Sequence, residues 1–428
     1  MNNNLQIFIE VLRAIIVILI VSKLIGQLFV LVGQPKVVGE MMAGVLLGPT
    51  CLGFFFPQFS GELFKRELMP FIFVLSNMGL SVYMFLIALE MDFTGIDRKA
   101  LRQSFTMSFL VIIVPMGLGI FAGILFFNEL RGAQANLFAF SLFLGCALAI
   151  TAFPTLARIL EEKGLVKTKL GAVSLLSASI QDIVSWVLLA FVTASAAKTT
   201  TSAASRALIG GVLFTVIMYW PVKFIIRWLY KMVKSGLVSR ETYFSILVLS
   251  LLLSALVTDY IGLYSVFGGF MLGLIVPRDE SAVNDIVIRL REITTVLFIP
   301  LFFSFSGLNA NFLALKNLHY LVPALAIILF ASSKYLVTTL VMRVNGFSWQ
   351  QASAAGGLMN ARGLMELIIA NIGLIYGVIS AAMYSILVLV AVVSTLTAVP
   401  IYNVSMNYSK KVRLPYPDGR RKKGKIYS

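Results

Sequence analysis

The chain has 428 residues, of which 59% are apolar and 13% are charged, and its formal net charge is +16. This composition excludes a soluble enzyme and a disordered protein, because a soluble fold of this length cannot hide so many apolar side chains. Cys51 and Cys146 lie in apolar stretches, which excludes a disulfide scaffold, and a single histidine, His319, excludes a multi-histidine metal site.

Stretches of about 20 apolar residues recur from end to end, which predicts an all-α polytopic membrane protein. We expect about 13 transmembrane helices within a membrane domain at 1–404, followed by a short basic cytoplasmic tail at 405–428. The predicted spans are 12–32, 37–54, 69–91, 103–126, 136–160, 168–196, 206–229, 241–259, 262–277, 288–306, 318–342, 350–373 and 380–402.

The positive charges are distributed unevenly over the predicted loops. If the C-terminus is cytoplasmic, 24 Lys and Arg residues fall on the cytoplasmic side and 6 on the other side. Short cytoplasmic loops carry an excess of Lys and Arg, so we expect the N-terminus outside and the C-terminus inside a cell (inner or plasma) membrane. The net charge is then explained by topology and anionic lipid, and we expect no nucleic-acid partner.

Two pairs of segments indicate an internal repeat. The segment 39–49 resembles 268–277, and 88–93 resembles 307–312, with offsets that correspond to seven spans. An odd offset inverts the second copy, and inverted repeats are typical of transporters. We expect a first repeat over about 12–196, a linker helix over about 206–229 and a second repeat over about 241–402; the alternative is chance similarity between apolar segments.

The same offset pairs the fifth span with the twelfth, and both contain helix-breaking residues. Proline removes a backbone donor and glycine weakens a helix, so matching interruptions predict a binding site between two crossing, broken helices. A simple proline kink is the alternative in the fifth span. The residues of the predicted breaks are Thr151, Ala152, Phe153 and Pro154 in the fifth span, and Gly356, Gly357, Asn360, Arg362 and Gly363 in the twelfth.

Buried charges point to the chemistry of this site. Asp182 lies near the middle of the sixth span, with Ser179 and Ser185 three residues away on either side and therefore on the same helix face. A carboxylate with neighbouring hydroxyls suits a dehydrated alkali cation, and an ionisable residue at this depth indicates function. The alternative is a structural ion pair with Lys334, the central charge of the eleventh span and the expected partner of Asp182.

The remaining charges in the spans have structural interpretations. We expect the positive charge of Arg362 to neutralise the carbonyl ends of half-helices, the alternative being direct ligation of the substrate, and we expect Glu366, four residues later, to pair with Arg362. Glu40, Glu90, Asp92 and Asp259 are expected to be interfacial or packing groups rather than ligands.

Taken together, these motifs resemble the second monovalent cation:proton antiporter family, which contains Kef-like, NapA-like and CHX-like proteins. The matching pieces run from the first predicted span to the twelfth: Gly33-Gln34-Pro35, Gly39-Glu40, Leu89-Glu90-Met91-Asp92, Ile150 to Pro154, Gln181-Asp182, Thr258-Asp259, Lys334 and Leu358 to Glu366. The resemblance implies a dimerising scaffold and a mobile core with two crossing broken helices, as in the NapA-like fold. It implies that Asp182 binds the cation and the proton, that Thr151 lines the crossing and that Lys334 partners Asp182. Gln181 stands where many relatives have Asp or Asn.

We therefore expect a homodimeric secondary antiporter that exchanges K⁺ or Na⁺ for H⁺ by alternating access, electroneutrally, without a cofactor or a bound metal. The alternatives are a channel-like K⁺ pathway, which requires a continuous polar pore, a carrier of an organic solute on the same scaffold, and a membrane sensor that transports nothing.

Overall fold

The computed structural model describes residues 3–90, 98–166, 168–196, 202–263, 265–308, 310, 312–316 and 318–412, and this part of the chain is almost entirely helical. The basic segment at 413–428 lies outside the described residues. The first half contains α1 (Asn3–Leu31), α2 (Lys36–Leu47), α3 (Leu52–Phe55), α4 (Pro57–Leu63), α5 (Met69–Glu90), α6 (Arg98–Leu125), α7 (Phe127–Leu130), α8 (Leu137–Ala149), α9 (Phe153–Glu162), α10 (Lys169–Ala196) and α11 (Ser202–Ile217). The second half contains η1 (Met218–Val222), α12 (Lys223–Lys234), α13 (Arg240–Ile261), α14 (Ser265–Ile275), α15 (Glu280–Ile293), η2 (Thr294–Phe298), α16 (Ile299–Leu308), η3 (Phe312–Lys316), α17 (Leu318–Val344), α18 (Trp349–Met359), α19 (Leu364–Ile375) and α20 (Ala381–Val412).

Eight helices of the described residues are long and apolar enough to cross a bilayer. The multi-pass membrane architecture is confirmed, whereas the expected number of 13 spans is not established by this criterion. Five predicted spans are not among the eight. The span 136–160 is divided between α8 and α9, the span 350–373 between α18 and α19, and the span 288–306 among α15, η2 and α16. The span 262–277 corresponds to the 11-residue α14, and the span 168–196 to the continuous helix α10.

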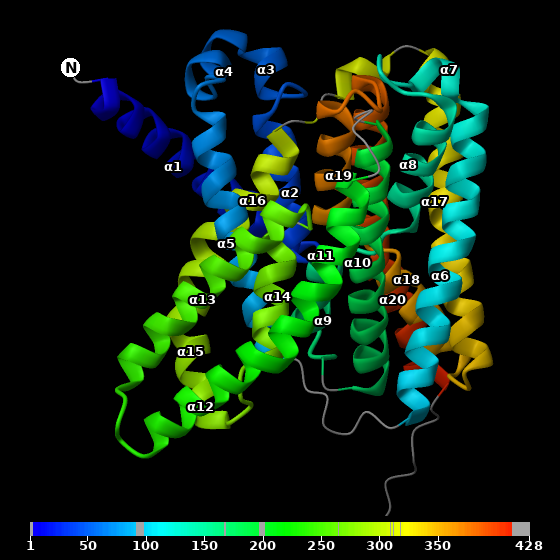
Figure 1. Ribbon diagram of the computed structural model, residues 1–428. Coiled ribbons are helices and arrows are strands. Elements are labelled where there is room, and N and C mark those ends of the chain that lie inside the picture. The colour runs from blue at the N-terminus through cyan, green and yellow to red at the C-terminus, as the bar shows by residue number, and fades with distance from the viewer. Residues whose placement is uncertain are drawn as a thin grey trace, which may run out of the picture.

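The helices form two bundles that lie side by side (Figure 1). One bundle, here called the scaffold bundle, contains α1, α2, α5, α13, α14, α15 and α16. The other, here called the core bundle, contains α6, α8, α9, α10, α17, α18, α19 and α20. Each bundle takes helices from both halves of the sequence, and the two are joined through α11, η1 and α12.

Small residues allow the closest helix contacts inside each bundle. Between α6 and α8, a Cβ added at Gly119 would lie 2.7 Å from the Cα of Gly145. Between α2 and α16, a Cβ added at Gly44 would lie 2.1 Å from the carbonyl oxygen of Ser304. In a membrane, where lipid is as apolar as leucine, such close backbone packing is a main source of helix association.

Candidate functional site

Two helices of the core bundle are interrupted where the sequence predicts breaks. The chain leaves α8 at Ala149, runs through non-helical residues 150–152 and enters α9 at Phe153. The second interruption covers residues 360–363, between α18 and α19. Gly356 and Gly357, predicted to belong to this break, lie inside α18 instead. Because they have no side chains, neighbouring helices pack closely there: an added Cβ would clash with α17 at Gly356 and with α20 at Gly357.

Phe153 and Pro154 begin a helix rather than interrupt one. Proline stands in the first turn of α9, where its missing N–H has no helical partner to lose and its fixed φ suits the helix. The break itself therefore precedes these two residues. Its position places the open N-terminal end of α9 next to the middle of α10.

The two breaks lie against each other. A Cβ added at Gly363 would lie 2.6 Å from Oγ1 of Thr155 in α9, so only a glycine fits there. On the other side of the second break, Thr395 of α20 accepts a hydrogen bond from the backbone N–H of Arg362 at 3.1 Å and donates to its carbonyl at 2.5 Å. Thr395 was not singled out from the sequence, because nothing in the pattern around it distinguishes it from other hydroxyls in apolar helices.

Arg362 is fully buried at this contact and satisfies the carbonyl end of α8. Its guanidinium donates to the carbonyl oxygens of Ala147 at 3.1 Å and Leu148 at 2.7 Å, and it forms an ion pair of 3.2 Å with Glu366. The last carbonyls of a helix have no internal partner and carry partial negative charge. The expected structural role of Arg362 and its expected pairing with Glu366 both correspond to these contacts.

Lys334 contacts the same helix end and not Asp182. Its Nζ donates a hydrogen bond of 2.7 Å to the carbonyl oxygen of Ala149, the last residue of α8, and its side chain is fully buried. Lys334 and Asp182 are both described, and no ion pair within 4 Å joins them, although their charges interact electrostatically. The direct pairing expected from the sequence is therefore replaced by a contact to the break beside Asp182, because the exposed carbonyl end of α8 attracts the cation.

Asp182 lies in the middle of α10 and is 6% exposed. The backbone N–H of Phe153, at the start of α9, interacts electrostatically with the Asp182 carboxylate, whose Oδ1 has no hydrogen-bond partner among the described residues. A helix N-terminus stabilises negative charge, while a free carboxylate oxygen can accept a proton or coordinate a cation.

The polar residues next to Asp182 on α10 and in the first break have hydrogen-bond partners of their own. Ser179 donates to the carbonyl of Leu175 at 2.9 Å and Ser185 to that of Gln181 at 2.6 Å, so both hydroxyl protons are used within α10. Thr151, in the first break, donates to the side-chain oxygen of Gln181 at 2.5 Å. Gln181 therefore ties the break to α10, and the hydroxyl oxygens keep lone pairs for another ligand.

A cavity of about 10 Å³ adjoins Asp182 and Ser179, between the core and scaffold bundles. Its apolar wall comes from Phe153 of α9, Met84 of α5 and two phenylalanines of α14, Phe267 and Phe270. The volume corresponds to about one water-sized sphere. Ser185 does not line it. The sequence indicated the carboxylate and Phe153 but not Met84 or Phe270, because these two residues belong to the scaffold bundle.

A second cavity, of about 240 Å³, lies between the same two bundles at the other end of α9, the end predicted to be cytoplasmic. We call it the vestibule. Arg291 of α15 bridges Glu90 of α5 at 2.5 Å and Glu161 of α9 at 2.6 Å. These residues therefore join the scaffold bundle to the core bundle at the vestibule.

A buried ion pair lies behind the vestibule. Arg158 of α9 is 3.5 Å from Glu40 of α2, and Glu40 is fully buried. Glu40 and Glu90, expected to be packing or interfacial groups, thus both take part in pairs at the boundary between the bundles. Asp259 accepts a hydrogen bond of 2.6 Å from the backbone N–H of Ser265 and has the packing role expected of it.

Comparison with known proteins identifies related chains. Residues 14–403 match the family described as "Sodium/hydrogen exchanger, transmembrane". The Na(+)/H(+) antiporter NhaS4 of Synechocystis sp. is 35% identical over 394 residues, covering 91% of this chain and 96% of the relative. The K(+)/H(+) antiporter 1 of Saccharomyces cerevisiae is 32% identical over 94% of this chain, and Cation/H(+) antiporter 15 of Arabidopsis thaliana is 31% identical over 88%. The matched region spans about half the length of the yeast and Arabidopsis relatives, 46% in each case.

The fold also matches a solved structure. The sodium proton antiporter MjNhaP1 from Methanocaldococcus jannaschii at pH 8 superposes with a TM-score of 0.63 over 95% of this chain and 99% of that chain, at 14% sequence identity. This likeness shows a common fold.

Proposed function

Because the chain belongs to the transmembrane sodium/hydrogen exchanger family, we propose that it exchanges a monovalent cation, K⁺ or Na⁺, for H⁺ by alternating access. One observation carries the proposal: a buried carboxylate with a free oxygen, Asp182, lies at the boundary between two helix bundles and beside two facing helix breaks. A proton and a cation compete for the same oxygen. That competition couples their movements without any covalent chemistry, cofactor or resident metal.

The surroundings of Asp182 support a small, dehydrated cation. The adjoining cavity of about 10 Å³ leaves no room for an organic solute, which argues against a carrier of larger substrates. Ser179 lines the same cavity as Asp182, and Ser185, Thr151 and Gln181 offer further oxygen atoms on α10 and in the first break. Oxygen is the ligand type that alkali cations prefer. A channel is not favoured, since a single deep carboxylate beside a one-sphere cavity differs from a continuous pore with several weak sites.

The two bundles provide the moving parts in this mechanism. We assign the scaffold bundle to the fixed, dimer-forming part of a homodimer and the core bundle to the part that carries Asp182 from one side of the membrane to the other. The division of helices between the bundles supports two inverted repeats, at about 12–196 and 241–402, joined by the linker helix near 206–229. The vestibule gives Asp182 access from the cytoplasmic side of a cell membrane, with the N-terminus outside and the C-terminus inside.

The charges at the crossing favour one-for-one exchange. Arg362 and Lys334 are both held by the carbonyl end of α8, and Glu366 is held by Arg362, which leaves Asp182 as the group that changes occupant. One carboxylate exchanges one proton for one cation, so each turnover is electroneutral.

Proton flux in proteoliposomes tests the role of Asp182. We expect Asp182→Asn to abolish cation-driven proton flux while the protein still folds, because the amide keeps the size and removes the titratable charge. Asp259→Asn is the matched control: it makes the same chemical change at the end of α13, where the amide oxygen still accepts from Ser265, and flux should persist. Robust cation-dependent flux through well-folded Asp182→Asn protein would reject the assignment.

A further inference from the structure

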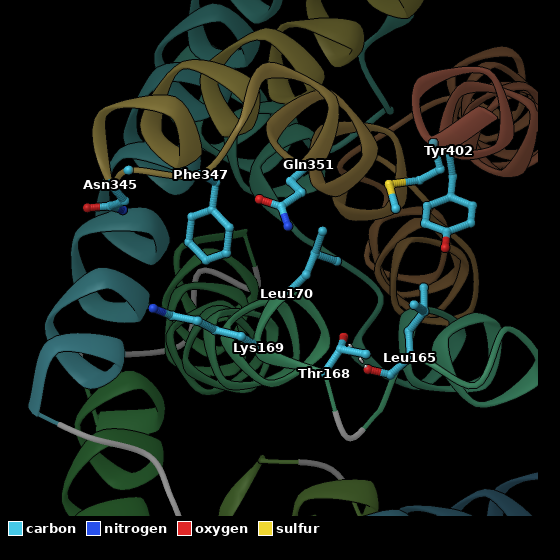
Figure 2. A pocket seen from close by; sticks show the side chains of 10 residues that line it. Leu165, Thr168, Lys169, Leu170, Asn345, Phe347, Gln351 and Tyr402 are labelled. Carbon is cyan, nitrogen blue, oxygen red and sulfur yellow. Dashed lines mark hydrogen bonds between the residues drawn. The ribbon is translucent and has the colours of Figure 1, made fainter. Parts of the chain in front are cut away.

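A cavity of about 370 Å³ lies inside the core bundle at the end predicted to be cytoplasmic. The turn before α10, the start of α10, the turn between α17 and α18, α18 itself and α20 surround it (Figure 2). We call it the basal pocket. Its volume falls in the range of small-molecule sites, roughly 300–1,000 Å³. No part of the exchange mechanism proposed above uses it.

The polar groups of the basal pocket include an ammonium and two amide groups, and its ten lining residues include no Asp or Glu. The side-chain Nδ2 of Asn345 is buried and has no acceptor among the described residues. Gln351 accepts from the backbone N–H of Ser348 through its Oε1, at 3.2 Å. Its NH₂ group remains to donate, and Figure 2 shows this nitrogen directed toward Leu170, across the pocket.

Lys169 supplies positive charge at the rim. Its Nζ lies 5.6 Å from the centre of the Phe347 ring, and no carboxylate of the described residues pairs with it. Both α10 and α18 begin at the pocket, so the partial positive charge of two helix N-termini adds to that of the ammonium. An anion entering here meets donors and a cation from several directions.

The rest of the lining is apolar. Leu170 and Phe347 are buried, and Tyr402 and Met406 of α20 complete the wall opposite the turn between α17 and α18. Such a surface suits the hydrocarbon or ring portion of a ligand whose charged group binds at Lys169. We propose that the basal pocket binds a small organic anion, one that carries a carboxylate or phosphate group on an apolar ring or short chain.

The basal pocket is separate from the transport site but shares its helices. Lys169 and Asp182 are 13 positions apart on α10, which corresponds to about 20 Å at 1.5 Å per residue. α18 runs from the pocket to the second break at Asn360. A ligand bound at the pocket therefore contacts the first turn of each helix that leads to the crossing, which suits a site that regulates exchange.

Titration of the purified full chain with phenyl phosphate tests the proposal, because this probe combines a phosphate with a ring. We expect saturable binding by calorimetry and an increase in thermal stability, and we expect benzyl alcohol, which has the ring without the charge, to produce neither. Lys169→Gln should weaken binding about tenfold, which corresponds to about 1.4 kcal/mol. Lys169→Arg should retain most of the affinity, because the positive charge is kept.

Lys163→Gln is the matched control. It removes one positive charge from the same cytoplasmic turn, at the end of α9, without lining the pocket, and binding should be unchanged. Equal losses in the two Lys→Gln variants would show binding to general surface charge and would overturn the proposal, as would an absence of saturable binding. Lys169 is exposed, so its replacement leaves folding intact.

A competition arm distinguishes two sources of the anion. Displacement of phenyl phosphate by phosphatidylglycerol in mixed micelles would assign the pocket to a lipid headgroup, and a failure of displacement would assign it to a soluble anion. Both results support an anion site. Because binding is measured without transport, the outcome does not depend on whether Asp182 carries the exchange.

Discussion

Membrane voltage is the perturbation that tests the charge arrangement at the crossing most directly. Four buried charged groups lie at the crossing, and three of them, Lys334, Arg362 and Glu366, have partners. Lys334 donates a hydrogen bond to the carbonyl of Ala149, and Arg362 pairs with Glu366 while it donates to the carbonyls at the end of α8. Of these four groups, Asp182 alone has no oppositely charged side chain within 4 Å, and its Oδ1 has no hydrogen-bond partner among the described residues. The structure therefore predicts that each turnover replaces one positive charge by another.

The magnitude follows from the number of charges moved. For one-for-one exchange, the cation gradient that balances a given proton gradient does not change with voltage. If Lys334 also releases a proton when the cation binds, two protons exchange for one cation and one net charge moves. The balancing cation gradient then changes tenfold for every ~59 mV, the one-charge value.

The assay measures the direction of proton flux in vesicles that contain a pH-sensitive dye. The voltage is set by a gradient of thiocyanate, a permeant anion, so that either Na⁺ or K⁺ serves as the exchanged cation. We expect the gradient at which flux reverses to be the same at 0 mV and at about −118 mV. A hundredfold displacement of this gradient, calculated from the same one-charge value, would refute one-for-one exchange and would identify Lys334 as a second proton carrier.

Two further predictions concern the break and the vestibule. Lys334→Met should destabilise the protein by about 1.5–3 kcal/mol in reversible unfolding, because a buried carbonyl of α8 loses a charge-assisted hydrogen bond. Lys334→Gln keeps a hydrogen-bond donor and should cost less. Equal stability of the Lys334→Met and wild-type proteins would show that the contact contributes nothing to stability. Glu161→Gln should change the exchange rate by up to about fivefold, because a partly exposed pair worth up to ~1 kcal/mol between the bundles is lost. Glu162→Gln removes a pair within α9 and leaves the Arg158–Glu40 pair in place, so it should leave the rate unchanged in the same vesicle assay. Identical rates in both variants would exclude a role for the Glu161–Arg291 contact between the bundles.

The membrane class, the positions of the two breaks and the presence of two charged residues, Asp182 and Arg362, inside apolar spans could all be predicted from the sequence, because each depends on a local property. Apolar stretches of bilayer length must be helical in lipid, since every backbone group needs an internal partner. Helix-breaking residues interrupt the chain where they stand, to within a few positions. A charge within an apolar span is visible in the sequence whatever its surroundings.

The tertiary structure decided which groups meet. Lys334 was expected to pair with Asp182 because it is the central charge of the eleventh predicted span, but it contacts the carbonyl of Ala149. The sequence shows where a helix breaks but not toward which side chain its exposed carbonyls point. Likewise, the cavity walls at Met84 and Phe270 and the Arg291 bridge join helices from opposite bundles, and such contacts depend on how the helices pack.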